Sequence, residues 1–144
     1  MKYLALFSLF SLLLFAQTPY TLTKYKSAYP VVEIYTQKVP MHYKAEILAI
    51  LKEYAEEMKI PINGYSDRAL GIIVSRIAVG EKLLLKVELL VGEDVMRLDD
   101  KEETFALTYQ KVDIFEVNNL EEDLIDSVEY LLEEFKEQYM EDNE

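Results

Sequence analysis

The sequence predicts an α+β domain with a four-stranded, largely antiparallel sheet and two helices packed on one face, in the order strand, helix, strand, strand, strand, helix. Residues 41–59 and 120–139 repeat apolar side chains every three or four positions, as one-sided helices do. Residues 69–91 are dense in Ile, Val and Leu and carry the turn pair Gly80-Glu81, as a hairpin does. Another strand-like segment, residues 104–117, follows it. One-sided helices and a one-sided sheet bury each other in two layers.

Residues 1–16 indicate a secretory signal peptide. Lys2 supplies the positive start, residues 3–15 form an apolar run broken only by two serines, and Ala16 is a small residue suited to the position before cleavage. The run is shorter than the roughly 20 residues that span a bilayer, which favours cleaved export over an uncleaved membrane anchor. We therefore expect a periplasmic or secreted protein without a stable membrane span after cleavage.

Residues 17–30 contain Thr, Lys and Ser, two Pro and three Tyr, and they show no helical period. This composition predicts a linker, or an arm lying on the domain surface, to which the tyrosines could dock. A single α+β domain is then expected over residues 31–144, beginning with a strand over residues 31–39. That strand could pair with the second strand in parallel or lie between others.

The two helices have recognisable ends. Pro40 suits the start of the first helix, and Pro61 cannot continue it. Asn118 or Asn119 can cap the last helix, with a glutamate three residues on in each case, which is the spacing of a capping box. Residues 140–144 are expected to fray.

The strands differ in how their faces are patterned. Alternating apolar residues over 83–91, with Lys86 and Glu88 between them, predict one buried and one wet face. Gly92 marks a bulge or the start of a turn. In the last strand, three residues are expected to share a face: Phe105, Leu107 and Tyr109.

The strand over residues 69–79 is apolar on both faces and gives the candidate partner or ligand surface: Ile73, Arg76, Ile77 and Val79. Arg76 lies in phase with Leu70, Ile72 and Val74, and opposite in phase to the other three candidates. It is expected to form a cross-strand ion pair with Glu88 or Asp113, or to clamp a ligand carboxylate. If the face bearing Ile73, Ile77 and Val79 is not covered by a helix, a partner or ligand should bind there.

Composition limits the chemistry. With no Cys, one His and four Gly, the sequence offers no thiol nucleophile, disulfide, cysteine metal site or phosphate-cradling loop. We therefore expect no enzyme activity, no cofactor, and no catalytic, cofactor-binding or metal-binding residues. The net charge of −12 is unfavourable for binding nucleic acid. Paired acids occur mainly in turns, where water solvates them: Glu93-Asp94, Asp99-Asp100, Glu102-Glu103 and residues 121–123.

The last helix carries the pattern Leu120-x3-Leu124-Ile125-x2-Val128-x2-Leu131-x3-Phe135-x3-Tyr139-x3-Asn143 after the strand over residues 106–109. This pattern resembles that of small exported bacterial proteins of unknown function. The resemblance spans residues 31–143 and implies an exported α+β domain, with no activity or site residues to transfer.

These observations predict an exported, non-enzymatic interaction or binding module. Its partner would be another exported or envelope protein that meets the uncovered sheet face, or an edge strand by strand addition. The alternative is a carrier of a small ligand or lipid, with an apolar pocket between sheet and helices. A hydrolase would need a cleft in which two carboxylates converge. The oligomeric state stays open.

Overall fold

The computed structural model describes residues 21–62 and 64–144 of the chain. The expected signal peptide, residues 17–20 of the expected linker or arm, and Asn63 lie outside the described residues. The elements are β1 (Tyr29–Ile34), α1 (Tyr43–Glu57), β2 (Arg68–Val79), β3 (Lys82–Met96), β4 (Glu103–Glu116) and α2 (Leu120–Asn143).

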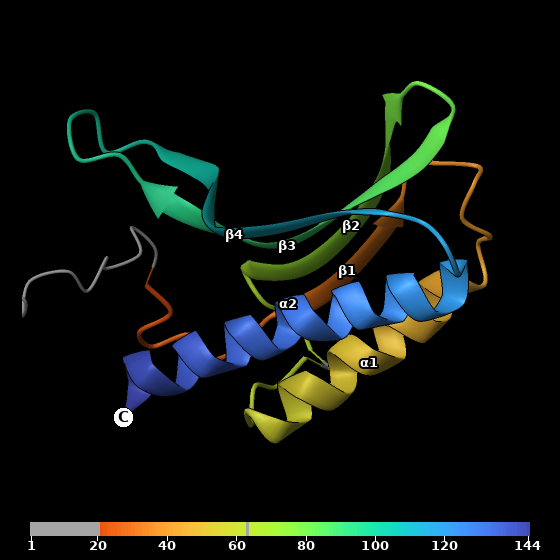
Figure 1. Cartoon of the computed structure of the whole chain (residues 1–144). Coiled ribbons are helices and arrows are strands. Elements are labelled where there is room, and N and C mark those ends of the chain that lie inside the picture. Colours follow the sequence, from red (N-terminus) through yellow and green to blue (C-terminus); the bar gives the residue numbers. More distant parts are fainter. Residues whose placement is uncertain (1–20, 63) are drawn as a thin grey trace, which may run out of the picture.

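The strands form one sheet in the order β1-β2-β3-β4. β1 pairs with β2 in parallel, and the other neighbours are antiparallel. Both helices lie on the same side of the sheet (Figure 1). The predicted α+β class and element order are therefore confirmed, and the first strand takes an edge position beside the second.

β1 is shorter than the segment expected from the sequence. It ends at Ile34, although the Tyr35 N–H still donates to the Val74 carbonyl at 2.8 Å. Beyond it, the Thr36 hydroxyl accepts a hydrogen bond from the Lys38 N–H at 3.2 Å. Such a local side-chain bond offers the backbone an alternative to the sheet, so the chain turns before Pro40.

Residues 21–28 form an arm that packs against the domain, with three apolar side chains buried in the core and polar ones exposed between them. Leu22, Tyr25 and Ala28 are each 4% exposed or less. The Tyr25 ring meets Phe135 of α2 edge-on, with 6.0 Å between ring centroids. These three residues are spaced three apart and separated by polar residues. The sequence pattern therefore does not reveal that they are buried.

The end of α2 holds this arm. The Asp142 carboxylate accepts a hydrogen bond from the Leu22 N–H at 2.6 Å. The Asn143 side chain accepts one from the Lys24 N–H at 2.9 Å and donates one to the Leu22 carbonyl at 3.0 Å. The expectation that residues 140–144 fray was wrong, because α2 continues to Asn143 and is tied to the arm.

The start of α2 uses a different acid from the one that the capping-box spacing suggested. Asn119 occupies the N-cap position, but its side chain makes no cap hydrogen bond. The Asp123 carboxylate instead accepts hydrogen bonds from the backbone N–H groups of Asn118 and Asn119, at 2.6 and 2.8 Å. The Asn119 amide donates to Glu122 at 3.1 Å. The negative charge of Asp123, in the first turn of α2, also interacts favourably with the positive end of the helix dipole.

A β-bulge sets which residues of β4 face the core. Val91 pairs with Tyr109, whereas Gly92 pairs with Leu107, so Thr108 is the extra residue. Val91 and Tyr109 are buried on the sheet face that the helices cover. Gly92 and Leu107 therefore point to the opposite face. The bulge expected at Gly92 is confirmed. The expectation that Phe105, Leu107 and Tyr109 share a face was wrong, because the extra residue reverses the alternation.

The interior between sheet and helices is apolar. Tyr109 and Phe135 are 0% exposed and meet edge-to-face at 5.2 Å between centroids. Around them lie fully buried aliphatic side chains from every layer: Ile47, Leu51, Leu70, Ile72, Val74, Leu85, Val87, Leu89, Leu124, Val128 and Leu132.

Replacing Leu85 by Ala should lower the free energy of unfolding by about 2–5 kcal/mol, because the side chain is fully buried. Glu88→Ala, on the opposite face of the same strand, should cost well under that, since an ion pair at the sheet surface contributes roughly 1 kcal/mol or less. Urea unfolding of both variants measures the difference. Equal, small losses would contradict the observed phase of β3.

Tyr25→Phe should change how stability depends on alkaline pH. Burial raises the pKa of Tyr25 above its ordinary value, so the folded protein keeps a proton that the unfolded chain loses near about pH 10. The stability from the neutral ring is therefore complete below that pH and is lost as the pH rises. The Phe variant has no such proton and should lose less stability in urea unfolding at alkaline pH.

At neutral pH the same variant should match the parent, because the Tyr25 hydroxyl has no hydrogen-bond partner among the described residues. Tyr130→Phe, at an exposed position of α2, is the matched control. An alkaline loss of equal size in the parent and in the Tyr25 variant would show that Tyr25 ionisation does not contribute to it.

Candidate functional site: the open sheet face and its aromatic cup

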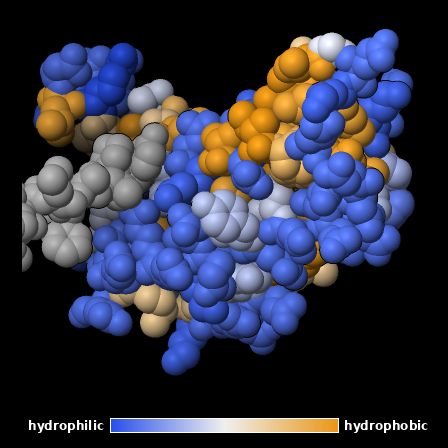
Figure 2. Space-filling view, viewed as in Figure 1, coloured by the Kyte–Doolittle hydropathy of each residue, from blue (hydrophilic) through white to orange (hydrophobic). Residues whose placement is uncertain are grey.

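The sheet face opposite the helices is uncovered among the described residues, and we call it the open face. Figure 1 shows both helices beneath the sheet, with the two hairpin ends curving toward the other side. Apolar side chains are exposed there: Val79 by 53%, Val112 by 43% and Ile114 by 52%. Figure 2 shows the resulting hydrophobic surface over the β2–β3 hairpin.

Charged side chains on the open face neutralise one another. Lys86 forms an ion pair with Glu88 at 2.8 Å, and the Gln110 amide donates to Glu88 at 3.1 Å. Nearer the β2–β3 turn, Lys82 pairs with Glu116 at 2.6 Å. The centre of the face therefore presents apolar side chains together with charges that already have partners.

Three of the four residues proposed from the sequence lie together on this face. Ile73 and Ile77 are half-buried and Val79 is exposed. Arg76 lies on the side that faces the helices, in register with the buried Leu85, and is solvent-exposed. Arg76 therefore does not share the surface of the other three.

The expected partners of Arg76 do not reach it. Glu88 points to the open face and is paired with Lys86. Within residues 21–62 and 64–144, Arg76 forms no ion pair, with Asp113 or with any other acid. For Glu88 the reason is the strict alternation of side chains, which puts it on the face opposite to Arg76. Asp113 lies on the same face as Arg76 but belongs to β4, two strands away from β2.

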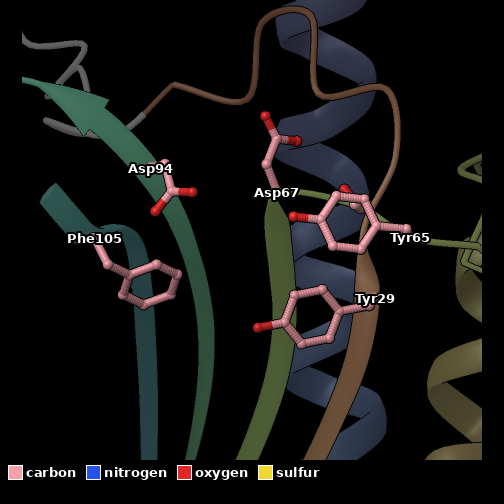
Figure 3. Close-up of a pocket in the computed structure, with 6 residues that line it drawn as sticks. Tyr29, Tyr65, Asp67, Asp94 and Phe105 are labelled. Atoms are coloured by element: carbon pink, nitrogen blue, oxygen red, sulfur yellow. The ribbon is translucent and has the colours of Figure 1, made fainter. Parts of the chain in front are cut away.

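At the end of the open face away from the β2–β3 turn lies a cavity of about 460 Å³, which we call the aromatic cup. Its lining comes from β1, β3, β4 and the segment before β2: Tyr29, Tyr65, Ser66, Asp67, Asp94 and Phe105. Figure 3 shows Phe105 on one side, Tyr29 and Tyr65 on the other, and the two tyrosine hydroxyls pointing toward the side of Phe105 and Asp94.

Small residues on the central strands make room for the cup. One row across the sheet runs Tyr29, Ala69, Gly92 and Leu107. The Phe105 ring lies directly over Gly92, where an added Cβ would be only 2.3 Å from the ring Cζ. The absence of a side chain at Gly92 therefore lets the edge of an aromatic ring from an edge strand reach over a central one.

The carboxylates of the cup lack a counter-charge. Asp67 and Asp94 are both exposed, and neither forms an ion pair with a described residue. Their sequence neighbours Arg68 and Glu93 pair with each other at 2.7 Å. Arg68 also donates to the Lys24 carbonyl at 3.1 Å and lies over the Tyr25 ring, so this cation is committed to the arm.

Aromatic ring faces beside unpaired carboxylates attract organic cations. Acid–base catalysis instead needs two carboxyl groups in contrasting environments, one of them shielded from water. Because Asp67 and Asp94 are both open to solvent, the arrangement favours cation binding over hydrolysis. Ser66, at the base of the cup, is engaged with the Ser27 hydroxyl at 3.2 Å and accepts from the Arg68 N–H at 3.2 Å.

Other chemistry-bearing residues are accounted for by structural contacts. His42 lies at the N-cap of α1 with its ring 4.3 Å from that of Tyr43, centroid to centroid. In the β3–β4 turn, Asp100 and Glu102 both pair with Arg97. No group of three or more His, Cys, Asp or Glu in the described ranges is placed to hold a metal ion.

None of the helices formed by residues 21–62 and 64–144 has the length and apolar character needed to cross a membrane.

Three further cavities lie at the surface. One is lined by residues between Ile34 and Met41, one by the end of α1 and the segment that follows it, and one by β4 and the start of α2. None of the three is enclosed between sheet and helices. They give no support to the expected apolar pocket of a carrier.

Comparison with protein-family models, with curated proteins and with solved structures finds no match to this chain.

Sequence reasoning did not single out the residues of the cup. Tyr29, Tyr65, Asp67, Asp94 and Phe105 come from separated segments, and no local spacing unites them. The available signal was Gly92: a glycine within an otherwise apolar strand indicates a bulge or the close approach of another group.

Gly92→Ala should displace the Phe105 ring, because the new Cβ cannot occupy the position of the ring edge. In a double-mutant cycle with Phe105→Ala, the alanine at 92 should cost more stability in the parent than in the background without the ring. Denaturant unfolding of the four proteins gives the coupling. Equal costs in the two backgrounds would mean that the ring does not rest on Gly92.

Proposed function

We propose that this protein is an exported, non-enzymatic interaction module whose open face binds a partner polypeptide. The observation that supports this proposal is the uncovered sheet face, on which Val79, Val112 and Ile114 are each exposed by 43–53%. A contiguous exposed apolar surface in a protein whose other sheet face is covered by helices is typical of an interaction site. A pleated, curved face suits an extended or helical segment laid across the strands.

Charge indicates the chemistry of the partner. The chain carries a net charge of −12, and the acids of the aromatic cup are unpaired, whereas the charges at the centre of the open face are internally neutralised. A complementary partner therefore brings apolar side chains to the centre and basic side chains to the periphery. Another exported or envelope protein is the partner that the expected compartment would supply.

Export rests on the N-terminal pattern of the sequence, with cleavage proposed after Ala16. A cut after Ala16 keeps the buried arm residues Leu22, Tyr25 and Ala28 in the mature chain.

A photo-crosslinking amino acid tests the docking surface. Placed at Ile114, 52% exposed, it should form adducts with another polypeptide in cells of the source organism. Placed at Tyr130, 54% exposed on α2, it should form none. The similar exposure of the two positions removes accessibility as an explanation, and the fragment captured at 114 should be rich in Lys and Arg.

Equal adduct formation at both positions, or none at either, would contradict the proposed surface. An adduct of two identical chains would show that a second copy covers the face in place of another protein. An adduct at the exposed edge of β4, with Ile114 silent, would indicate strand addition. The same preparation tests export, because N-terminal sequencing of the protein from the extracytoplasmic fraction should begin at Gln17.

A further inference from the structure

We propose that the aromatic cup receives one cationic side chain, the guanidinium of Arg or the ammonium of Lys, from the polypeptide that docks on the open face. The inference rests on the proposed function for the source of the cation. The recognition itself rests on the walls, charge and position of the cup.

The walls provide ring surfaces on two sides. Phe105 comes from β4 and Tyr29 from the opposite edge strand, with Tyr65 beside Tyr29 (Figure 3). The rings are accessible: Tyr29 is 40% exposed, Phe105 56% and Tyr65 completely. A cation between such rings interacts with the negative faces of the π-systems, and a planar guanidinium can also stack on them.

The charge is negative and available. Next to the cup Arg68 and Glu93 neutralise each other, while Asp67 and Asp94 lack an ion-pair partner among the described residues. Among the residues that the structure describes, no basic side chain lines the cup. An incoming cation would therefore meet two carboxylates without first displacing a cation of the protein itself.

The position connects the cup to the docking surface. Tyr29 and Leu107 belong to the same cross-sheet row as the small residues Ala69 and Gly92, and the next row begins the apolar centre with Val31 and Leu90. A segment lying on the open face therefore passes over the floor of the cup. One basic residue at its end would anchor it and fix its direction.

The cup can be tested without the partner. The probes are N-acetyl-arginine amide and its neutral counterpart N-acetyl-citrulline amide, which has nearly the same shape. Titrated into the full chain and followed by NMR of the Tyr29, Tyr65 and Phe105 rings, the arginine probe should give saturable shifts and the citrulline probe none. N-acetyl-lysine amide should bind as well, and choline should bind no more tightly than either basic probe.

Matched charge variants separate local recognition from overall charge. Asp67→Asn with Asp94→Asn should weaken binding of the arginine probe by roughly three- to tenfold. Glu81→Gln with Glu129→Gln removes two exposed acids outside the cup and should leave binding unchanged. Both pairs change the net charge equally. Phe105→Leu should also weaken binding while leaving the fold intact by circular dichroism.

Equal shifts from arginine and citrulline probes, or no saturable shift, would overturn cation recognition. Equal weakening in both double variants would reduce it to long-range attraction and overturn the site. Tighter binding of choline would assign the cup to a free quaternary ammonium ligand and overturn the docking role. Probe binding without crosslinking at Ile114 would instead sink the proposed function alone, and crosslinking without probe binding would sink the cup alone.

Discussion

The edge-to-face contact of Tyr109 with Phe135 is the interaction on which the remaining structure depends. Tyr109 belongs to the last strand and Phe135 to the last helix, and Tyr25 from the arm also meets Phe135 edge-on. Three segments distant in sequence are thereby joined in one buried aromatic column. Because Tyr109 must point inward, the extra residue at Thr108 sends Leu107 and Phe105 outward. The core and the aromatic cup are thus two results of one change in register.

The sequence was most informative where structure follows from local period. The fold class, both helices and the hairpin could be predicted because apolar spacing along a segment decides which side of it is buried. The surface bearing Ile73, Ile77 and Val79 was found for the same reason, since that strand is apolar on both faces. The burial of the arm, the change of facing in β4 before Tyr109 and the cup were missed because they depend on contacts across the chain. The polar residues around Tyr25 do not reveal that its ring packs on Phe135. The alternation around Tyr109 does not reveal that its side chain points to the same ring.

The two faces of the sheet differ in how their side chains meet water. The inner face is closed by two helices, which remove its aliphatic side chains from water. The outer face keeps apolar side chains in water and pairs its central charges, Lys86 with Glu88 and Lys82 with Glu116. Such pairing lowers the cost of burying this surface against another molecule, since the charges enter the contact already matched. Asp67 and Asp94 have no ion-pair partner among the described residues. They make the end of the outer face that holds the cup more negative than its centre.

The bond between the arm and the end of α2 has a consequence for the order of folding. Leu22 and Asp142 are 120 positions apart in the sequence. The Leu22 N–H nevertheless donates a hydrogen bond to the Asp142 carboxylate at 2.6 Å. During synthesis the arm emerges early, but its hydrogen bonds to the end of α2 cannot form until Asp142 and Asn143 have been made. Closing so large a loop is entropically expensive and therefore late. The native contacts at the start of the chain therefore cannot be completed before its last residues have been made.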